Sequence, residues 1–190
     1  MAVKIWRCKV CGDGYVGEEK TTQCPFCGVH EKHMILAKNW TPKEGLDIPV
    51  KNQTEKSRKN VQEALRVELS NSAFYFCSAD KCKDTEGKAM FRALAKVERE
   101  HASTWRKILQ LAKADVPHSD SCPETYMGEL QESHDRESDA IKQYAKFRDE
   151  AEEPRLKQLF QAIVEVETDH LGLSEERMKQ LITLMVNGNP

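Results

Sequence analysis

Four cysteines near the N-terminus have the spacing of a metal site. They form two Cys-x-x-Cys pairs, Cys8–Cys11 and Cys24–Cys27, with twelve residues between the pairs and a glycine after each pair. Two intervening residues let both thiolates of one turn point at one metal, and the glycine permits a backbone that turns amide hydrogens toward sulfur. Four thiolates in tetrahedral array suit zinc or iron. The spacing therefore predicts a tetrathiolate metal site and does not separate iron from a structural zinc ribbon.

Two Glu-x-x-His motifs, Glu98–His101 and Glu167–His170, point to a second metal site. On a helix, positions i and i+3 share a face, so each motif presents a carboxylate beside an imidazole. Both motifs interrupt helical stripes that are otherwise apolar. Charged groups in a core are costly unless they are paired or bound to a metal, so the pattern favours metal ligands.

An internal repeat of 69 residues extends this set. The shift takes Glu68 to Glu137, Tyr75 to Tyr144 and the first Glu-x-x-His motif to the second. Two helical hairpins related by a pseudo-two-fold axis would then bring four glutamates and two histidines together, which is the ligand set of ferritin-like di-iron bundles. The predicted ligands are Glu68, Glu98, His101, Glu137, Glu167 and His170.

The helix start and stop signals predict a mainly α protein. Residues 1–36 are expected to form a small four-cysteine domain, 37–53 a linker and 54–190 a four-helix bundle. The helices are expected at about 54–79, from Asp84 to about 114, from a capping box at Ser121, and from Pro154 to about 185.

At these residues the chain resembles the rubrerythrins. Trp6-Arg-Cys8 with Cys24-Pro-Phe-Cys27-Gly28 resembles their shortened rubredoxin module, and the order of domains resembles the branch in which this module comes first. The resemblance covers nearly the whole chain apart from the linker. It implies one redox-active iron at the four cysteines, with zinc as a substitute in recombinant protein, and two irons at the six glutamates and histidines. Tyr75 and Tyr144 are then hydroxyl groups beside the bridging carboxylates, although both could equally be ordinary core aromatics.

One position departs from the family pattern. Rubrerythrins carry a further glutamate one turn after the ligand of the third helix, and Ala140 stands there in this chain. His134, one turn before Glu137 on the expected ligand face, is a candidate seventh ligand or proton donor, or simply a hydrogen-bonded neighbour. A rival register uses Glu129 and Glu132, but neither lies on the apolar stripe or obeys the repeat.

The remaining histidines and cysteines are interpreted as structural. His30 and His33 lie near a site that four thiolates already complete, so both are expected at the surface. Cys77, Cys82 and Cys122 have no partner at metal-ligand spacing and are interpreted as structural thiols; a redox role is the alternative, and nothing in the sequence supports it.

The resemblance implies an oxidoreductase that reduces hydrogen peroxide, and in the reversed branch also dioxygen, to water. Two ferrous ions can deliver two electrons together, protons can come from nearby histidine and tyrosine, and a thiolate-bound iron suits re-reduction. The electrons would come from NAD(P)H through a separate reductase, since the chain has no nucleotide fingerprint. The rival functions are a ferroxidase or iron-handling ferritin relative, an electron-transfer or redox-sensing module, and a structural zinc ribbon attached to an empty bundle.

Net charge and hydropathy limit the kinds of partner that the sequence predicts. The net charge of -2 gives no electrostatic reason to expect nucleic acid or anionic membrane as a partner. No apolar run approaches the roughly 20 residues that span a bilayer, and the N-terminus lacks the apolar core of a signal peptide. We therefore expect a cytoplasmic protein.

The connection between the second and third expected helices is short for its task. In ferritin-like bundles these helices run parallel, so the chain must return along the bundle over a distance on the order of 40 Å. The roughly nine residues available reach roughly 30 Å. The lengths predict a domain-swapped homodimer in which each di-iron site draws on two subunits.

Overall fold

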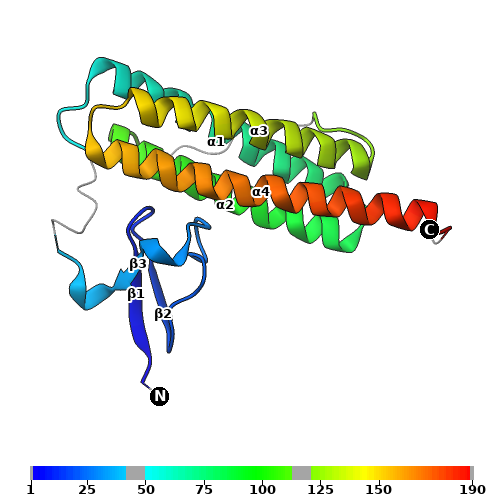
Figure 1. Ribbon diagram of the computed structural model, residues 1–190, viewed down its shortest axis with the longest axis horizontal. Coiled ribbons are helices and arrows are strands. Elements are labelled where there is room, and N and C mark those ends of the chain that lie inside the picture. Colours follow the sequence, from blue (N-terminus) through cyan, green and yellow to red (C-terminus); the bar gives the residue numbers. More distant parts are fainter. Residues whose placement is uncertain (1, 42–49, 113–120, 189–190) are drawn as a thin grey trace.

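A computed structural model describes residues 2–41, 50–112 and 121–188 of the chain (Figure 1). The N-terminal module, residues 2–41, holds three strands, and the rest of the described chain is helical. The elements are β1 (Lys4–Cys8), β2 (Gly14–Gly17), η1 (Glu31–His33), β3 (Met34–Leu36), η2 (Ala37–Asn39), α1 (Glu55–Lys81), α2 (Thr85–Leu109), α3 (Tyr126–Glu150) and α4 (Pro154–Val186). The expected mainly α class, with a small N-terminal four-cysteine region, is confirmed.

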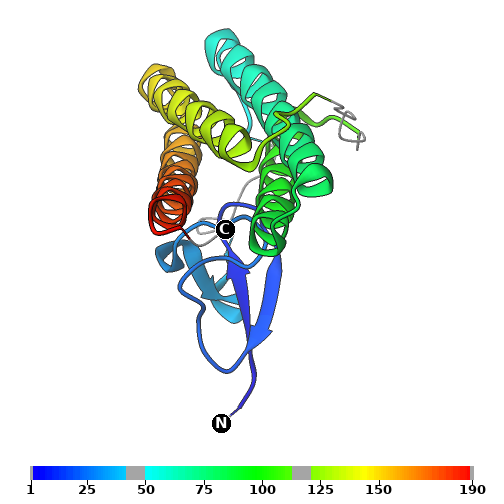
Figure 2. The same cartoon turned by 90° about the vertical axis from the view of Figure 1, so that its right-hand side faces the viewer.

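The four long helices form a bundle of two hairpins. Helix α1 packs along α2, and α3 packs along α4. Seen from the end of the bundle, α1 and α3 form one side and α2 and α4 the other, with the module below the second side (Figure 2). Within the described chain no helix has the length and apolar character that a bilayer span requires.

Side-chain caps determine where three of the helices begin. Thr54, Asp84 and Thr125 each accept a hydrogen bond from a backbone amide three residues later. Such a bond satisfies an amide that no helical carbonyl reaches. Asp84 is the predicted cap, but the capping box predicted at Ser121 is wrong. Cys122 forms a disulfide with Cys77 of α1 and holds this segment outside the helix, so α3 begins only after Thr125.

Helix α2 ends at Leu109, about five residues before the predicted end. Gln110 takes a left-handed conformation with a φ of 59°, which stops the helix. The connection to α3 therefore contains sixteen residues, 110–125, which can span roughly 50 Å. The length argument for a domain swap is thus wrong, because this connection can return along the bundle within one chain. Residues 113–120 of it lie outside the described residues, and the homodimer itself stays a prediction.

The module is a three-stranded antiparallel sheet with the order β2-β1-β3. Charged and polar side chains attach it to α4. Gln23 Nε2 and His30 Nε2 lie 2.8 and 2.7 Å from Asp169 Oδ2, and Lys32 Nζ lies 2.6 Å from Glu165 Oε1. His30 lies at the surface as predicted, with its side chain 37% exposed, and pairs there with α4. His33 is half-buried beside it, 3.7 Å from Glu165.

Stacked aromatic rings fill the bundle at both ends of its polar middle. Trp105 lies 4.9 Å from Phe160 and 6.1 Å from Tyr144 between ring centroids, and Tyr75 lies 6.1 Å from Phe91. All five rings are less than 2% exposed. They enclose the space between the helices in which the candidate metal ligands lie.

Gly28 lies where the module closely approaches helix α4 of the bundle. Its φ is +73°, and a Cβ there would lie 3.1 Å from Val166 Cγ1 of α4. We expect Gly28→Ala to destabilise the module by about 1–2 kcal/mol, because a left-handed alanine is strained and the contact is tight. Thermal unfolding of the metal-loaded protein measures this. Gly14→Ala is the control, since its Cβ would meet nothing closer than Trp6 O at 3.8 Å; equal losses in both variants would contradict the explanation.

Candidate metal centres

The four-cysteine cluster (Cys8, Cys11, Cys24 and Cys27) lies at the end of the module that faces the bundle. The sulfur atoms of Cys8 and Cys27 are 3.7 Å apart, and those of Cys11 and Cys24 are 3.9 Å apart. All four side chains are at most 3% exposed. Four convergent sulfur atoms shielded from solvent can hold one metal ion.

The backbone of each Cys-x-x-Cys turn supports the sulfur atoms as the sequence predicted. Gly12 and Gly28 have φ angles of 88° and 73°, which side-chain-bearing residues rarely adopt. The amide of Val10 lies 3.3 Å from the sulfur of Cys8 and donates to it. Amide hydrogens directed at sulfur favour the thiolate form that metal binding needs.

The carboxylate–histidine cluster lies in the middle of the bundle and takes side chains from all four helices. Two overlapping groups of potential ligands occur, and within each group the ligand atoms lie within 4.8 Å of one another. The groups are Glu68, Glu98, His101 and Glu167, and Glu98, Glu137, Glu167 and His170. Glu98 and Glu167 belong to both, so the geometry is that of two neighbouring metal positions with two shared carboxylates.

Both imidazoles present Nδ1 to the carboxylates. His101 Nδ1 lies 3.3 Å from Glu167 and 3.4 Å from Glu98. His170 Nδ1 lies 2.9 Å from Glu167 and 3.0 Å from Glu98. Each ring therefore directs Nδ1 inward and its other nitrogen, Nε2, away from the cluster.

The cluster is buried and poorly satisfied by the protein itself. The four glutamates and His101 are 0% exposed, and His170 is 8% exposed. Both carboxylate oxygens of Glu98, one oxygen of each other glutamate and Nδ1 of His101 have no hydrogen-bond partner. Burying such groups without partners is costly, and a coordinated metal removes that cost. The residues present therefore fit a bound pair of metal ions.

The electrostatics of the cluster also favour cations. Burial, followed by the charge of neighbouring glutamates, raises the pKa of Glu68 and of Glu137 well above the usual range. Burial alone would lower the pKa of His101 and of His170, but the surrounding carboxylates outweigh it and raise both well above their usual value. Protons thus occupy the positions at which divalent cations would neutralise the charge.

Tyr75 and Tyr144 connect the two hairpins through the cluster. The hydroxyl of Tyr75 on α1 donates to Glu137 of α3, and that of Tyr144 on α3 donates to Glu68 of α1. Burial and the neighbouring carboxylates raise the pKa of both phenols well above 10, so both remain donors. Glu68 and Glu137 each belong to only one of the two ligand groups, whereas Glu98 and Glu167 belong to both. The tyrosines therefore contact the unshared glutamates, which corrects the expectation that they lie beside the bridging carboxylates.

His101 joins the two candidate centres. Its Nε2 lies 2.9 Å from the carbonyl oxygen of Cys27, while its Nδ1 faces the carboxylates. One imidazole and one peptide unit therefore span from the four-cysteine cluster to the carboxylate–histidine cluster. The bundle covers the other cysteine turn as well, because Lys107 Nζ donates to the carbonyl of Cys11 at 3.0 Å.

His170 opens onto a cleft between the module and the bundle. The cleft has a volume of about 400 Å³ and apolar walls from α2 and α4, and Cys24 also lines it. A small molecule in this cleft would touch a side chain of each cluster. The cleft is therefore a candidate approach to the carboxylate–histidine cluster.

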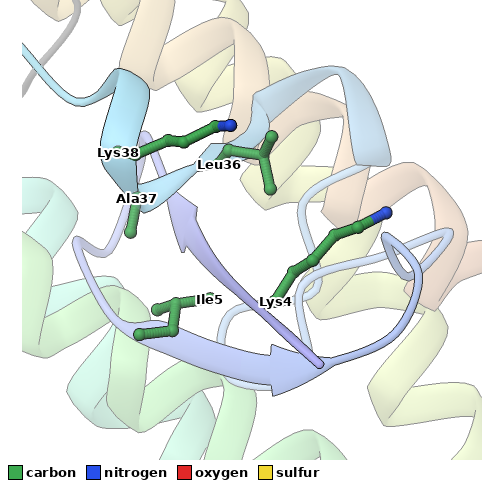
Figure 3. Close-up of a pocket in the computed structure, with 5 residues that line it drawn as sticks. All are labelled: Lys4, Ile5, Leu36, Ala37 and Lys38. Atoms are coloured by element: carbon green, nitrogen blue, oxygen red, sulfur yellow. The ribbon is translucent and has the colours of Figure 1, made fainter. Parts of the chain in front are cut away.

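A second hollow lies on the module alone (Figure 3). Its volume is about 290 Å³, and the lysines in it extend along its rim beside short apolar side chains. The lining residues are Lys4, Ile5, Leu36, Ala37 and Lys38. None of these is a metal-ligating type, so we assign no chemistry to the hollow.

His134 does not join the cluster. Its side chain is 30% exposed, and its ring lies 3.2 Å from Asp135 and 3.7 Å from Glu175. Glu137 and Tyr144 are buried on the ligand face of α3 as predicted, but the placement of His134 on that face is wrong, because the buried residue one turn before Glu137 is Ser133.

The rival register is not supported by the geometry. Glu129 is buried, but it lies beside Cys82 and outside both groups of ligands, and burial raises its pKa to about 7. Glu132 pairs with Arg136 at 2.8 Å near the surface.

Sequence reasoning missed two polar groups around the cluster. Ser133 Oγ lies 2.8 Å from the hydroxyl of Tyr75, and Trp105 Nε1 donates to Glu68 at 3.5 Å. Ser133 could have been found from its spacing of four residues before Glu137, which places both on one helix face.

The bundle and its ligand set define the class of ferritin-like carboxylate proteins with a two-metal site. A family model described as rubrerythrin matches residues 59–182, about two thirds of the chain. The chain belongs to the rubrerythrin family, as its sequence predicted, and the four-cysteine cluster fits a rubredoxin-like module. A search of curated proteins found no match. Membership in the family indicates an iron-binding protein of the oxidoreductase class.

Substitutions should separate the shared glutamates from the others. We expect Glu98→Gln to lower the affinity for both metals of the bundle at least tenfold, because Glu98 belongs to both ligand groups. Glu68→Gln should lower mainly the affinity for one metal. Titration of metal-free protein with Co²⁺ measures this, since thiolate absorption distinguishes the cysteine site. Glu132→Gln is the control; a loss of only one metal in Glu98→Gln would contradict the shared role.

Metal binding to the bundle should release protons. Glu68 and Glu137 have raised pKa values and so retain protons without metal, whereas ligation requires their carboxylates. Affinity should therefore fall as the pH is lowered. Calorimetric titration of metal into the metal-free protein, in buffers of different ionisation enthalpy, counts the protons. Glu68→Gln should release fewer, and a heat that does not depend on the buffer would show the expectation to be wrong.

Proposed function

We propose that this protein is a non-haem di-iron peroxidase that reduces hydrogen peroxide to water, with electrons supplied through iron at the four-cysteine cluster. Iron in the bundle would supply two electrons together to the oxidant, and iron at the cysteines would supply one electron at a time. Dioxygen is a second possible oxidant for the same centre. The proposal assigns the six glutamates and histidines and the four cysteines as iron ligands.

The contact between His101 and the carbonyl of Cys27 carries this proposal. A four-cysteine module that served only as a structural zinc ribbon would have no need to touch a ligand of the second cluster. Here the module is attached by the paired charges of α4 so that its metal end faces that ligand. The arrangement supports electron transfer within one chain over a short bonded route.

Residues of this chain can be assigned to hold protons beside the metal ligands and to line the approach of peroxide to the cluster. Tyr75 and Tyr144 hold protonated hydroxyls against Glu137 and Glu68, and their hydrogen bonds orient these carboxylates. We propose that peroxide approaches through the cleft at His170, the only cluster residue above 0% exposure among those that the structure describes. The aromatic rings at both ends keep bulk water from the rest of the centre.

The ferroxidase alternative differs in what is consumed. A ferritin relative would oxidise added Fe²⁺ repeatedly and would not need the module. The position of the module against His101 favours a centre that is re-reduced from within the chain.

A separate NAD(P)H-dependent reductase and a homodimer complete the proposal. Light scattering of the metal-loaded protein should give twice the chain mass of 21.7 kDa. Non-reducing electrophoresis then distinguishes an exchanged dimer, in which the bond between Cys77 and Cys122 would join two chains, from a dimer with the intrachain bond.

Anaerobic stopped-flow tests the reaction. The fully reduced iron protein is mixed with one equivalent of peroxide, and we expect oxidation of the bundle centre first and the absorption of the oxidised cysteine-bound iron afterwards. Cys11→Ser should leave the first phase within about twofold and lower steady-state peroxide turnover at least tenfold, because it removes the relay. A cysteine-bound iron that stays reduced would exclude the relay. Faster turnover of added Fe²⁺ than of peroxide would favour the ferroxidase.

A further inference from the structure

A disulfide joins Cys77 and Cys122, which are 45 residues apart. Both had been interpreted as structural thiols, and the bond shows that interpretation to be wrong. The other five cysteines are free thiols, four in the metal cluster and one at Cys82. One pair is thus oxidised in a chain whose remaining cysteines are reduced. In reducing compartments such bonds are more often transient or redox-sensing than permanent.

The bond has one accessible end and one sheltered end. Cys77 lies on α1 and is 6% exposed. Cys122 is half-buried and lies in the segment before Thr125, outside any helix. Cys122 is thus the more exposed residue of the pair, and we infer that a nucleophile attacks its sulfur.

We propose that Cys77 and Cys122 are a second redox site, which peroxide closes and a small dithiol opens, and that its state adjusts the order of α1 and α3 around Glu137. This inference goes beyond the di-iron reaction; only its rate measurement rests on the proposed function, whereas thiol labelling and amide exchange do not. The oxidant is the class of molecule that the metal centre is proposed to reduce, and the reductant is a dithiol.

Both directions are simple sulfur chemistry. In closing, the Cys122 thiol gives up a proton, its thiolate attacks peroxide and forms an S–OH group, and the departing hydroxide takes up that proton to become the first water. The thiol of Cys77 then displaces the second water as the S–S bond forms. In opening, one thiolate of the dithiol attacks the sulfur of Cys122, and Cys77 leaves and takes a proton. The second thiol of the reductant then displaces Cys122 and becomes part of a cyclic disulfide.

The bond lies beside a contact to the metal ligands. Tyr75, two residues before Cys77, donates to Glu137 on α3 and lies 2.8 Å from Ser133. The half-buried Cys122 packs against the same apolar cluster as Tyr75. The disulfide therefore connects α1 to the segment just before α3, and the tyrosine connects α1 to the first half of α3. When the disulfide is open, this end of α1 loses its covalent link to the segment before α3, and the hydrogen bonds of Tyr75 remain. We therefore expect Glu137 to become less well ordered.

Cys82 provides a matched control. It is 5% exposed, burial raises its pKa, and its Sγ lies 3.6 Å from the carbonyl of Asp84. A buried thiol with a raised pKa reacts slowly with peroxide and with disulfides. We expect it to take no part in the exchange.

The test uses metal-loaded protein under native conditions. Dithiothreitol is added, free thiols are alkylated, and peptides are mapped by mass spectrometry. We expect label at Cys77 and Cys122, unchanged helix content by circular dichroism, and reclosure by peroxide added in excess of the bound iron. Amide hydrogen exchange in the first half of α3 should rise at least threefold in the opened form, and the initial peroxide rate should fall at least threefold.

Two variants complete the test. Cys122→Ser should behave as the opened form in both measurements and should not respond to dithiothreitol, whereas Cys82→Ser should respond as the unchanged protein does. If Cys122→Ser does not fold, the reduced natural protein still gives both readouts. The proposal is overturned if the bond stays closed in native protein, or if it opens with no change in exchange or rate.

Discussion

The burial of four carboxylates and two imidazoles in the middle of one helical bundle is the constraint on which the rest of this structure depends. Oxygen and nitrogen atoms that lack partners would destabilise the fold, and the same atoms are the ligands for a pair of cations. The groups around the ligands compensate for that burial or hold the ligands in place. Tyr75 and Tyr144 hold single carboxylates, and stacked aromatic rings fill the bundle on each side, so that the ligands are held in place before any metal binds.

The two halves of the repeat carry the same ligands but have different surroundings. His101 and His170 are equivalent by the repeat, and both direct Nδ1 at Glu98 and Glu167. The outer nitrogen of His101 meets the carbonyl of Cys27, whereas His170 borders an open cleft. The repeat therefore accounts for the six ligands, and the module, which packs on only one face, places one histidine against a cysteine turn and leaves the other at the cleft.

The attachment of the module explains this difference. Asp169 and Glu165 are one turn apart on α4 and flank the candidate ligand Glu167, so residues that contact the module and a residue of the carboxylate–histidine cluster alternate along the same helix. The acidic residues turn outward to the module, and Glu167 turns inward. Any movement of α4 would therefore change the positions of side chains in both clusters. The disulfide acts at the opposite pair of helices, α1 and α3, and restrains the side of the cluster that the module does not cover.

The sequence by itself determined which side chains of this protein form the two candidate metal sites. Local spacing places Cys8 beside Cys11 and Glu98 beside His101, and the repeat of 69 residues is enough to bring the six bundle ligands together, because helix periodicity and pseudo-symmetry do not depend on the details of packing. Tertiary structure alone decided three matters. On α3, Ser133 lies inside and His134 outside, although both are about one turn from Glu137, since which of two neighbouring positions is buried depends on what packs against the helix. The bond between Cys77 and Cys122 depends on two distant segments meeting, and it also moved the start of α3. The contact of His101 with Cys27 arises from the docking of two separately folded parts, and neither part carries a local pattern that specifies the other.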